Sequence, residues 1–281
     1  MILHRHYISH GINGSITFDG VGYCIYCKTA PNGEPLTDEH IIPDGLRGNL
    51  ILRDASCKNC AKAINYFESR TINHNFGSVR EFLKIRSGKR RGKRRTPFET
   101  SYQAYTHEGS QKSARYPIND SSFSVLSFEI TGLRAGILCD RPSTEKLPLA
   151  LHLAGGNPDS FPRNSSVQNL VFVGGYTKMA AKIAHSYAYA ILRDRFTEYL
   201  DLFILDDEDF SARSYHIGVA PKELTREGYL HSLTIRTEKV DVTPLPGLGT
   251  RPKNFVIVEM RLFANFGTHT TEIVVGEMPV E

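Results

Sequence analysis

The sequence has no apolar run that approaches the ~20 residues needed to cross a bilayer. Its first twenty residues are polar and rich in histidine, and they lack the apolar centre of a secretory signal. No internal repeat of solenoid length is visible. From these absences we expect a soluble cytoplasmic protein with no membrane partner.

Cysteine is scarce, with five in 281 residues, and four of the five form two C-x-x-C pairs. These are Cys24 with Cys27 and Cys57 with Cys60. A reducing compartment makes disulfides unusual, so paired C-x-x-C turns favour a metal site. Cys139 stands alone in the segment GILCDRP, where we expect a small buried apolar side chain.

Acidic residues are almost missing from one stretch of the chain. The net charge is +4, but residues 80–95 hold nine Lys or Arg and one acid, a local charge of +8, so the other residues must carry −4. A densely negative partner should bind there. The residues expected to contact nucleic-acid phosphates are Lys89, Arg90, Arg91, Lys93, Arg94 and Arg95. The alternative is a solvated linker, and the lack of aromatic residues in this tract argues against base stacking as its main mode.

The length predicts about two domains at roughly 150 residues each. We expect an α+β protein with a small zinc-bound domain over 1–75, a basic connector over 76–114 and a larger α+β domain of unassigned role over 115–281. Residues 1–20 are expected to form an irregular or hairpin-like lead-in. The larger domain should contain a helix at 178–193, with His185 packed and hydrogen-bonded, and strands at 123–130, 231–236, 254–263 and 271–275.

The two cysteine pairs are separated by 29 residues. Zinc binds four thiolates tetrahedrally, and each C-x-x-C turn directs two sulfurs at one point, so we predict one structural zinc. Four unliganded buried cysteines are the alternative. The gap exceeds the usual ~15–20 residues and holds the insert LTDEHIIPDGLRGNLILRDAS.

This insert predicts a strand over 36–43, a turn over 44–48 and a strand over 49–52. A helix should follow from near Cys57, capped by Asp54 or Ser56. A second short helix is expected over 78–85.

The dipeptide Glu39-His40 is the next feature. A histidine with the ordinary pKa near ~6.5 can take a proton from water at neutral pH, and a carboxylate can hold Mg²⁺ against a phosphate oxygen. On an extended strand, the two side chains point to opposite faces unless a bend before Pro43 brings them together. Alone, the dipeptide is a weak signal, and a surface location is the default interpretation. Its position between two zinc-type pairs makes a catalytic role worth testing.

The run Cys24-x-x-Cys27, Glu39-His40-Ile-Ile-Pro43, Gly45-Leu-x-Gly48-Asn49 and Cys57-x-x-Cys60 resembles the zinc-stapled branch of the HNH endonucleases over about residues 20–70. The resemblance implies a ββα-metal fold and cleavage of phosphodiester bonds in DNA. It implies that His40 is the general base, that Glu39 binds a catalytic ion such as Mg²⁺ and that Asn49 supports the histidine. A residue of the helix should complete this metal site.

The sequence departs from the family pattern after the second C-x-x-C. The family usually has His or Asn there, whereas this chain has Ala61, which cannot bind a metal. Asn65, one helical turn later, is the expected substitute, and Glu68 is another. A solvated helix face explains Asn65 equally well.

These observations predict an HNH-type endonuclease that acts on DNA with a structural Zn²⁺ and a catalytic Mg²⁺ or similar ion. RNA is an alternative substrate. A catalytically weak or inactive zinc-stabilised nucleic-acid-binding module is the alternative function, and a zinc domain that serves protein contacts is a third. The oligomeric state is left open.

Overall fold

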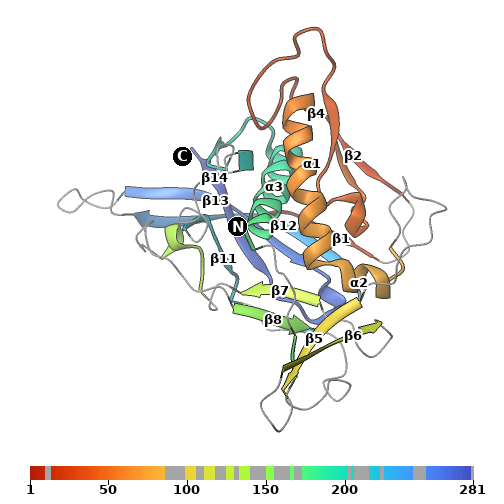
Figure 1. Ribbon diagram of the computed structural model, residues 1–281. Coiled ribbons are helices and arrows are strands. Elements are labelled where there is room, and N and C mark those ends of the chain that lie inside the picture. Colours follow the sequence, from red (N-terminus) through yellow and green to blue (C-terminus); the bar gives the residue numbers. More distant parts are fainter. Residues whose placement is uncertain are drawn as a thin grey trace.

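The computed structural model describes residues 1–9, 14–85, 133–139, 173–200, 204–205, 215–221, 225–242 and 251–279, together with the backbone of strands at 99–105, 111–117, 125–129, 150–154 and 165–167. The chain combines β-sheets with a few helices, which confirms the expected mixed α/β content (Figure 1). The basic tract Lys89–Arg95 lies outside the described residues.

The largest sheet among the described residues is six-stranded and antiparallel. Its centre is a meander of three long strands, with β13 and β14 buried over most of their length and β12 buried over its first half. These are β12 (His231–Val242), β13 (Arg251–Leu262) and β14 (Thr271–Met278), flanked by β1 (Ile2–Ile8), β10 (Thr197–Glu198) and β11 (Ile217–Val219). The three strands expected in this region are confirmed, with β12 continuing six residues beyond the predicted end at 236.

The expectation of an irregular or hairpin-like lead-in over residues 1–20 was wrong for its first residues. Residues Ile2–Ile8 form β1, which pairs antiparallel with β12 at the edge of the large sheet. The N-terminal amine also donates to the carbonyl of Thr237. The start of the chain therefore belongs to the same sheet as the C-terminal strands.

The cysteine-bearing segment forms a hairpin followed by a helix, in the predicted order. Strand β3 (Thr37–His40) pairs antiparallel with β4 (Leu50–Ser56), and α1 (Lys58–Asn75) begins two residues after β4. Strand β2 (Ile16–Phe18) adds to the other edge of β4 in parallel. The order strand, strand, helix is confirmed.

Helix α1 forms because its apolar positions recur at helical spacing. Cys60, Ile64 and Phe67 are buried on one side, as the pattern predicts. The expected capping by Asp54 or Ser56 was wrong, since Cys57 is the N-cap residue and makes no side-chain capping bond.

The turn between β3 and β4 is a short 3-10 segment, Asp44–Leu46, followed by Arg47 in the left-handed region. Gly48 is required there because a Cβ at this position would lie 1.9 Å from the carbonyl oxygen of Ile42. This close contact between Gly48 and Ile42 lets the chain turn tightly from β3 into β4.

Helix α3 (Val173–Leu192) lies beside α1 and crosses β13 and β14 (Figure 1). It starts five residues before the predicted helix. One apolar core includes Ile41 of the hairpin, Ala184 of α3 and Ile273 of β14. The expected domain boundaries at 75 and 115 stay a prediction, although this core spans both sides of them.

The remaining elements lie at the rim of these layers. The short helix expected over 78–85 is α2 (Gly77–Phe82), and the strand expected over 123–130 is β7 (Val125–Glu129). The other strands are β5 (Glu99–Tyr105), β6 (Gln111–Pro117), β8 (Ala150–Ala154) and β9 (Ser165–Val167). Within the described parts of the chain, no helix has the length and apolarity to span a bilayer.

Cys139 was expected to be buried, and this was wrong. It follows the short 3-10 segment Gly136–Leu138, whose residues are buried, but its own side chain is exposed. The apolar side chains before it fill the local core, so the cysteine is left on the surface.

His231 connects the large sheet to the hairpin turn. Its Nε2 donates to the carbonyl of Leu46 at 2.8 Å, and its Nδ1 accepts from the backbone N–H of Phe263 at 3.1 Å. Burial lowers the pKa of His231 from 6.5 to about 4, although the bond to Leu46 acts in the opposite direction.

We expect this histidine to make the protein less stable in mild acid. Between pH 6.5 and about 4, the unfolded chain binds a proton that the folded chain does not, so the free energy of unfolding falls as the pH falls through this window. The loss is about 3 kcal/mol at 1.36 kcal/mol per pH unit. Denaturant titrations of wild type and His231→Gln should show a steeper pH dependence for wild type, and equal slopes would contradict the assignment.

Candidate metal centre and the adjoining strand face

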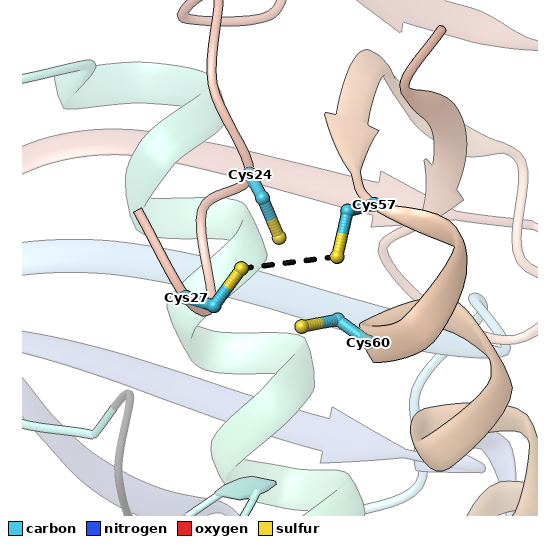
Figure 2. A group of neighbouring side chains, drawn as sticks. All are labelled: Cys24, Cys27, Cys57 and Cys60. Carbon is cyan, nitrogen blue, oxygen red and sulfur yellow. Dashed lines mark hydrogen bonds between the residues drawn. The ribbon is translucent and has the colours of Figure 1, made fainter. Parts of the chain in front are cut away.

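The four paired cysteines meet at one point between the start of α1 and the loop before β3. Their sulfurs all lie within 4.8 Å of one another and point toward a common centre (Figure 2). The Sγ atoms of Cys27 and Cys57 are 3.7 Å apart, which is too far for a disulfide. A tetrahedral zinc with ~2.3 Å bonds separates its sulfurs by about 3.8 Å. The four cysteines could therefore hold a metal ion such as zinc.

The first C-x-x-C turn is shaped by backbone hydrogen bonds. The N–H of Lys28 donates to the carbonyl of Cys24 at 2.8 Å, with Lys28 in the left-handed region at φ 59°. The N–H of Ile25 donates to Ala55 of β4 at 2.9 Å. The turn is thereby fixed to the strand that leads into Cys57, which holds the two cysteine pairs in register.

Burial and hydrogen bonds shift the pKa values of the thiols in different directions. Burial raises the pKa of Cys24 and of Cys60. Burial also acts to raise the pKa of Cys27, but hydrogen bonds with Thr29, Cys24 and Cys60 outweigh it and lower the value to about 6. Thiolates in so small a space repel one another, and a divalent metal offsets this repulsion.

Helix α3 supports the cysteine turn from the core side. His185 is fully buried, and its Nε2 donates to the carbonyl of Ile25 at 2.9 Å, which confirms the expected packed histidine. The ammonium of Lys28 donates to the same carbonyl at 2.9 Å and pairs with Glu198 at 2.7 Å. His185 of α3 and Glu198 thus stabilise the turn that carries Cys24 and Cys27.

Glu39 and His40 point to opposite faces of β3, as expected for an extended strand. Glu39 is 7% exposed and faces the helices, whereas His40 is exposed. The bend before Pro43 does not bring the two side chains together. His40 pairs with Ile51 across the hairpin, so its imidazole lies on the outer face.

Asn49 directly precedes β4 and lies two positions before Ile51, the partner of His40. The Nδ2 of Asn49 donates to the carbonyl of Gly14 at 3.1 Å, and its buried Oδ1 has no hydrogen-bond partner among the described residues.

The carboxylate of Glu39 is held by a buried lysine from α3. The Nζ of Lys182 lies 2.5 Å from Glu39 and 2.9 Å from Glu68 of α1. Lys182 is 0% exposed and Glu68 is 9% exposed. Removing Lys182 leaves two uncompensated buried carboxylates, and the loss of one partner of a buried ion pair costs about 3–5 kcal/mol.

The pKa values reflect this arrangement. Burial acts to lower the pKa of Lys182, but the two carboxylates outweigh it and raise the pKa above its ordinary value. Burial raises the pKa of Glu68 to about 6, with Lys182 opposing the shift and Glu39 adding to it. Lys182 is therefore a cation at neutral pH.

Asn65 lies on the solvent side of α1. Its side chain is exposed, and its Nδ2 donates to the carbonyl of Ala61 in the preceding turn at 2.9 Å. The helix residue that shares a partner with Glu39 is Glu68 instead. A metal-binding role for Asn65 stays a prediction.

Lys182 was missed by the sequence interpretation. The signal was present, because the lysine stands next to two alanines and an isoleucine in a helix that is buried over most of its length. Lysine is almost never fully buried without a partner. The sequence alone did not identify Glu39 and Glu68 as that partner, since they come from a strand and a helix more than 100 residues away.

Comparisons of the chain with protein-family models, with curated proteins and with solved structures found no match.

Proposed function

We propose that the chain is a metal-dependent phosphodiesterase that hydrolyses DNA, with an HNH-like ββα unit carrying the catalytic residues and a larger α+β part beside it. The observation that carries the proposal is the combination of the four-cysteine site with an exposed His40 at the end of β3. The cysteines join the loop before β3 to the start of α1, so a bound zinc would make the hairpin a rigid support for the imidazole.

His40 would act as the general base. In the neutral form, its imidazole takes a proton from water, and the water oxygen forms a bond to phosphorus as the bond from phosphorus to the 3′ oxygen breaks. The 3′ oxygen then takes a proton from solvent, which leaves a 5′-phosphate and a 3′-hydroxyl. An exposed histidine suits this role because the scissile phosphate of a duplex must reach it from outside.

Asn49 and Glu39 would support this step. The Oδ1 of Asn49, which has no hydrogen-bond partner among the described residues, would accept a hydrogen bond that orients the imidazole or the water. A divalent ion such as Mg²⁺ at Glu39, completed by Asn65 or Glu68, would supply Lewis-acid stabilisation of the charge on the phosphate. This role requires the Glu39 carboxylate to leave Lys182 and the buried face of β3 opposite His40.

The basic tract Lys89–Arg95 gives the proposal its substrate class. Six cations within seven residues can follow a phosphate backbone without reading its sequence. RNA presents the same phosphates, so the tract favours nucleic acid in general, and DNA is proposed from the resemblance of residues 20–70 to HNH endonucleases.

A second candidate is a nucleic-acid-binding module that does not cleave. Two observations favour it: the carboxylate of Glu39 pairs with Lys182 at 2.5 Å, and Ala61 stands where the HNH pattern has a metal ligand. Both features would weaken the binding of a catalytic ion without affecting the zinc site or the basic tract.

The experiment that tests the proposal combines plasmid nicking with a gel mobility assay. The purified full chain should shift DNA with an affinity that falls steeply with salt, and it should nick supercoiled plasmid when Mg²⁺ is present. Salt-sensitive binding without nicking over a series of divalent ions would favour the binding module. The absence of both would overturn the two candidates and leave a zinc domain that serves protein contacts.

A further inference from the structure

The ammonium of Lys182 lies in a cage of oxygen atoms. Four oxygens surround its Nζ, and they come from two carboxylates and two backbone carbonyls. These are Glu39 at 2.5 Å, Glu68 at 2.9 Å, the carbonyl of His40 at 2.5 Å and the carbonyl of Ile41 at 3.4 Å. Carboxylate and carbonyl oxygens are also the ligands that hard divalent cations prefer.

The charges of this cage are not balanced by Lys182 alone. Glu39 and Glu68 contribute two negative charges, and the ammonium contributes one positive charge, so a buried net charge of −1 remains. A divalent cation in the same place would neutralise both carboxylates. Net charge therefore favours a divalent ion over the ammonium, provided that the lysine side chain can leave.

Tyr26 adds an independent observation. Its side chain is 2% exposed, and its hydroxyl makes no hydrogen bond of standard geometry among the described residues. The hydroxyl lies beside the cage, since burial, the charges of Glu39 and Glu68 and a side-chain interaction with Glu39 raise its pKa. It is therefore a further oxygen next to the carboxylates of the cage.

We propose that Lys182 and a divalent cation are alternative occupants of this oxygen cage. Lys182 is carried by α3, whereas Glu39, His40 and Glu68 are carried by β3 and α1. With α3 docked, the lysine closes the cage, and a divalent ion binds only when the ammonium withdraws. The inference rests on the proposed function for the purpose of the ion, because Glu39 is the carboxylate assigned to it, but occupancy of the cage can be measured without any cleavage.

The test replaces Lys182 by methionine, which keeps the side chain as far as Cε and removes the charged Nζ. We expect the Lys182→Met chain to bind one Tb³⁺ per chain with tyrosine-sensitised luminescence from Tyr26, at least about tenfold tighter than wild type, where tenfold corresponds to 1.4 kcal/mol. Ca²⁺ should compete with Tb³⁺ and should raise the melting temperature of Lys182→Met but not that of wild type.

Two variants serve as controls. Lys182→Met combined with Glu68→Gln should lose the tight site, and Lys62→Met, which removes an exposed lysine of α1, should behave like wild type. If Lys182→Met does not fold in ion-free buffer, it is refolded with Ca²⁺, and recovery of the native circular dichroism is the expected result.

A folded Lys182→Met chain without a tight site, a wild type that binds equally well, or a variant that Ca²⁺ cannot refold would each overturn the proposal. These outcomes differ from failure of the proposed function. If the protein never nicks DNA but Lys182→Met binds Tb³⁺ as described, only the proposed nuclease activity is refuted. If the protein nicks DNA but Lys182→Met gains no tight Tb³⁺ site, only the proposal that Lys182 and a divalent cation share the cage is refuted.

Discussion

The His40→Ala chain is expected to nick supercoiled plasmid at least about 100-fold more slowly than wild type, because a positioned general base contributes ~10²–10⁴-fold to such a step. Its affinity for DNA should be unchanged. The imidazole of His40 is exposed on the outer face of β3. The buried Lys182 contacts the backbone carbonyl of His40, which alanine keeps. Alanine therefore removes the base and leaves the fold intact. Initial nicking rates in Mg²⁺, with a mobility shift measured in parallel, give both quantities.

His74→Ala is the matched control, since this residue is also exposed and lies near the end of α1. It should nick at the wild-type rate. A His40→Ala chain that nicks as fast as this control would refute the role of His40 as base. A His40→Ala chain that no longer binds DNA would assign the imidazole to contact with the phosphate instead.

Replacement of Cys60 by serine is expected to remove the metal and unfold the hairpin and α1 together. A hydroxyl does not replace a thiolate as a zinc ligand, and structural zinc contributes on the order of 10 kcal/mol to the folding of small domains. Cys60 is 6% exposed, so water cannot easily complete the coordination. Zinc content per chain, and the melting temperature followed by circular dichroism, measure the two effects.

Cys139→Ser is the control for this experiment. Cys139 is exposed and stands outside the cluster of four. Its replacement should leave the zinc content and the melting temperature as in wild type. Equal behaviour of the two serine variants would mean that the cluster holds no structural metal.

The zinc-type cluster and its hairpin and helix were predictable because their signals are local. Each C-x-x-C pair forms one turn, and the intervening strands and the buried stripe of α1 follow from short-range periodicity. Strand alternation left two outcomes open for Glu39 and His40, opposite faces or convergence at a bend before Pro43, and the nuclease hypothesis needed both side chains to face one phosphate. The structure places them on opposite faces, with His40 exposed and Glu39 buried.

The rest depends on partners far away in the sequence. The sequence of β1 is partly polar because about half of the strand faces solvent, so it was predicted to be an irregular lead-in. Its pairing with β12, more than 200 residues later, makes it a strand. Lys182 could be recognised as unusual but not assigned, because its partners come from β3 and α1. Cys139 was placed inside because its neighbours are apolar, yet those neighbours turn inward and leave it exposed.

X-ray absorption at the zinc K-edge of the purified chain shows whether the four paired cysteines hold a zinc ion. With the sulfurs of Cys24, Cys27, Cys57 and Cys60 all within 4.8 Å of one another, we expect one zinc per chain bound by four sulfurs at ~2.3 Å. A chain that purifies without stoichiometric metal, or whose zinc is bound mainly by nitrogen and oxygen, would contradict the account.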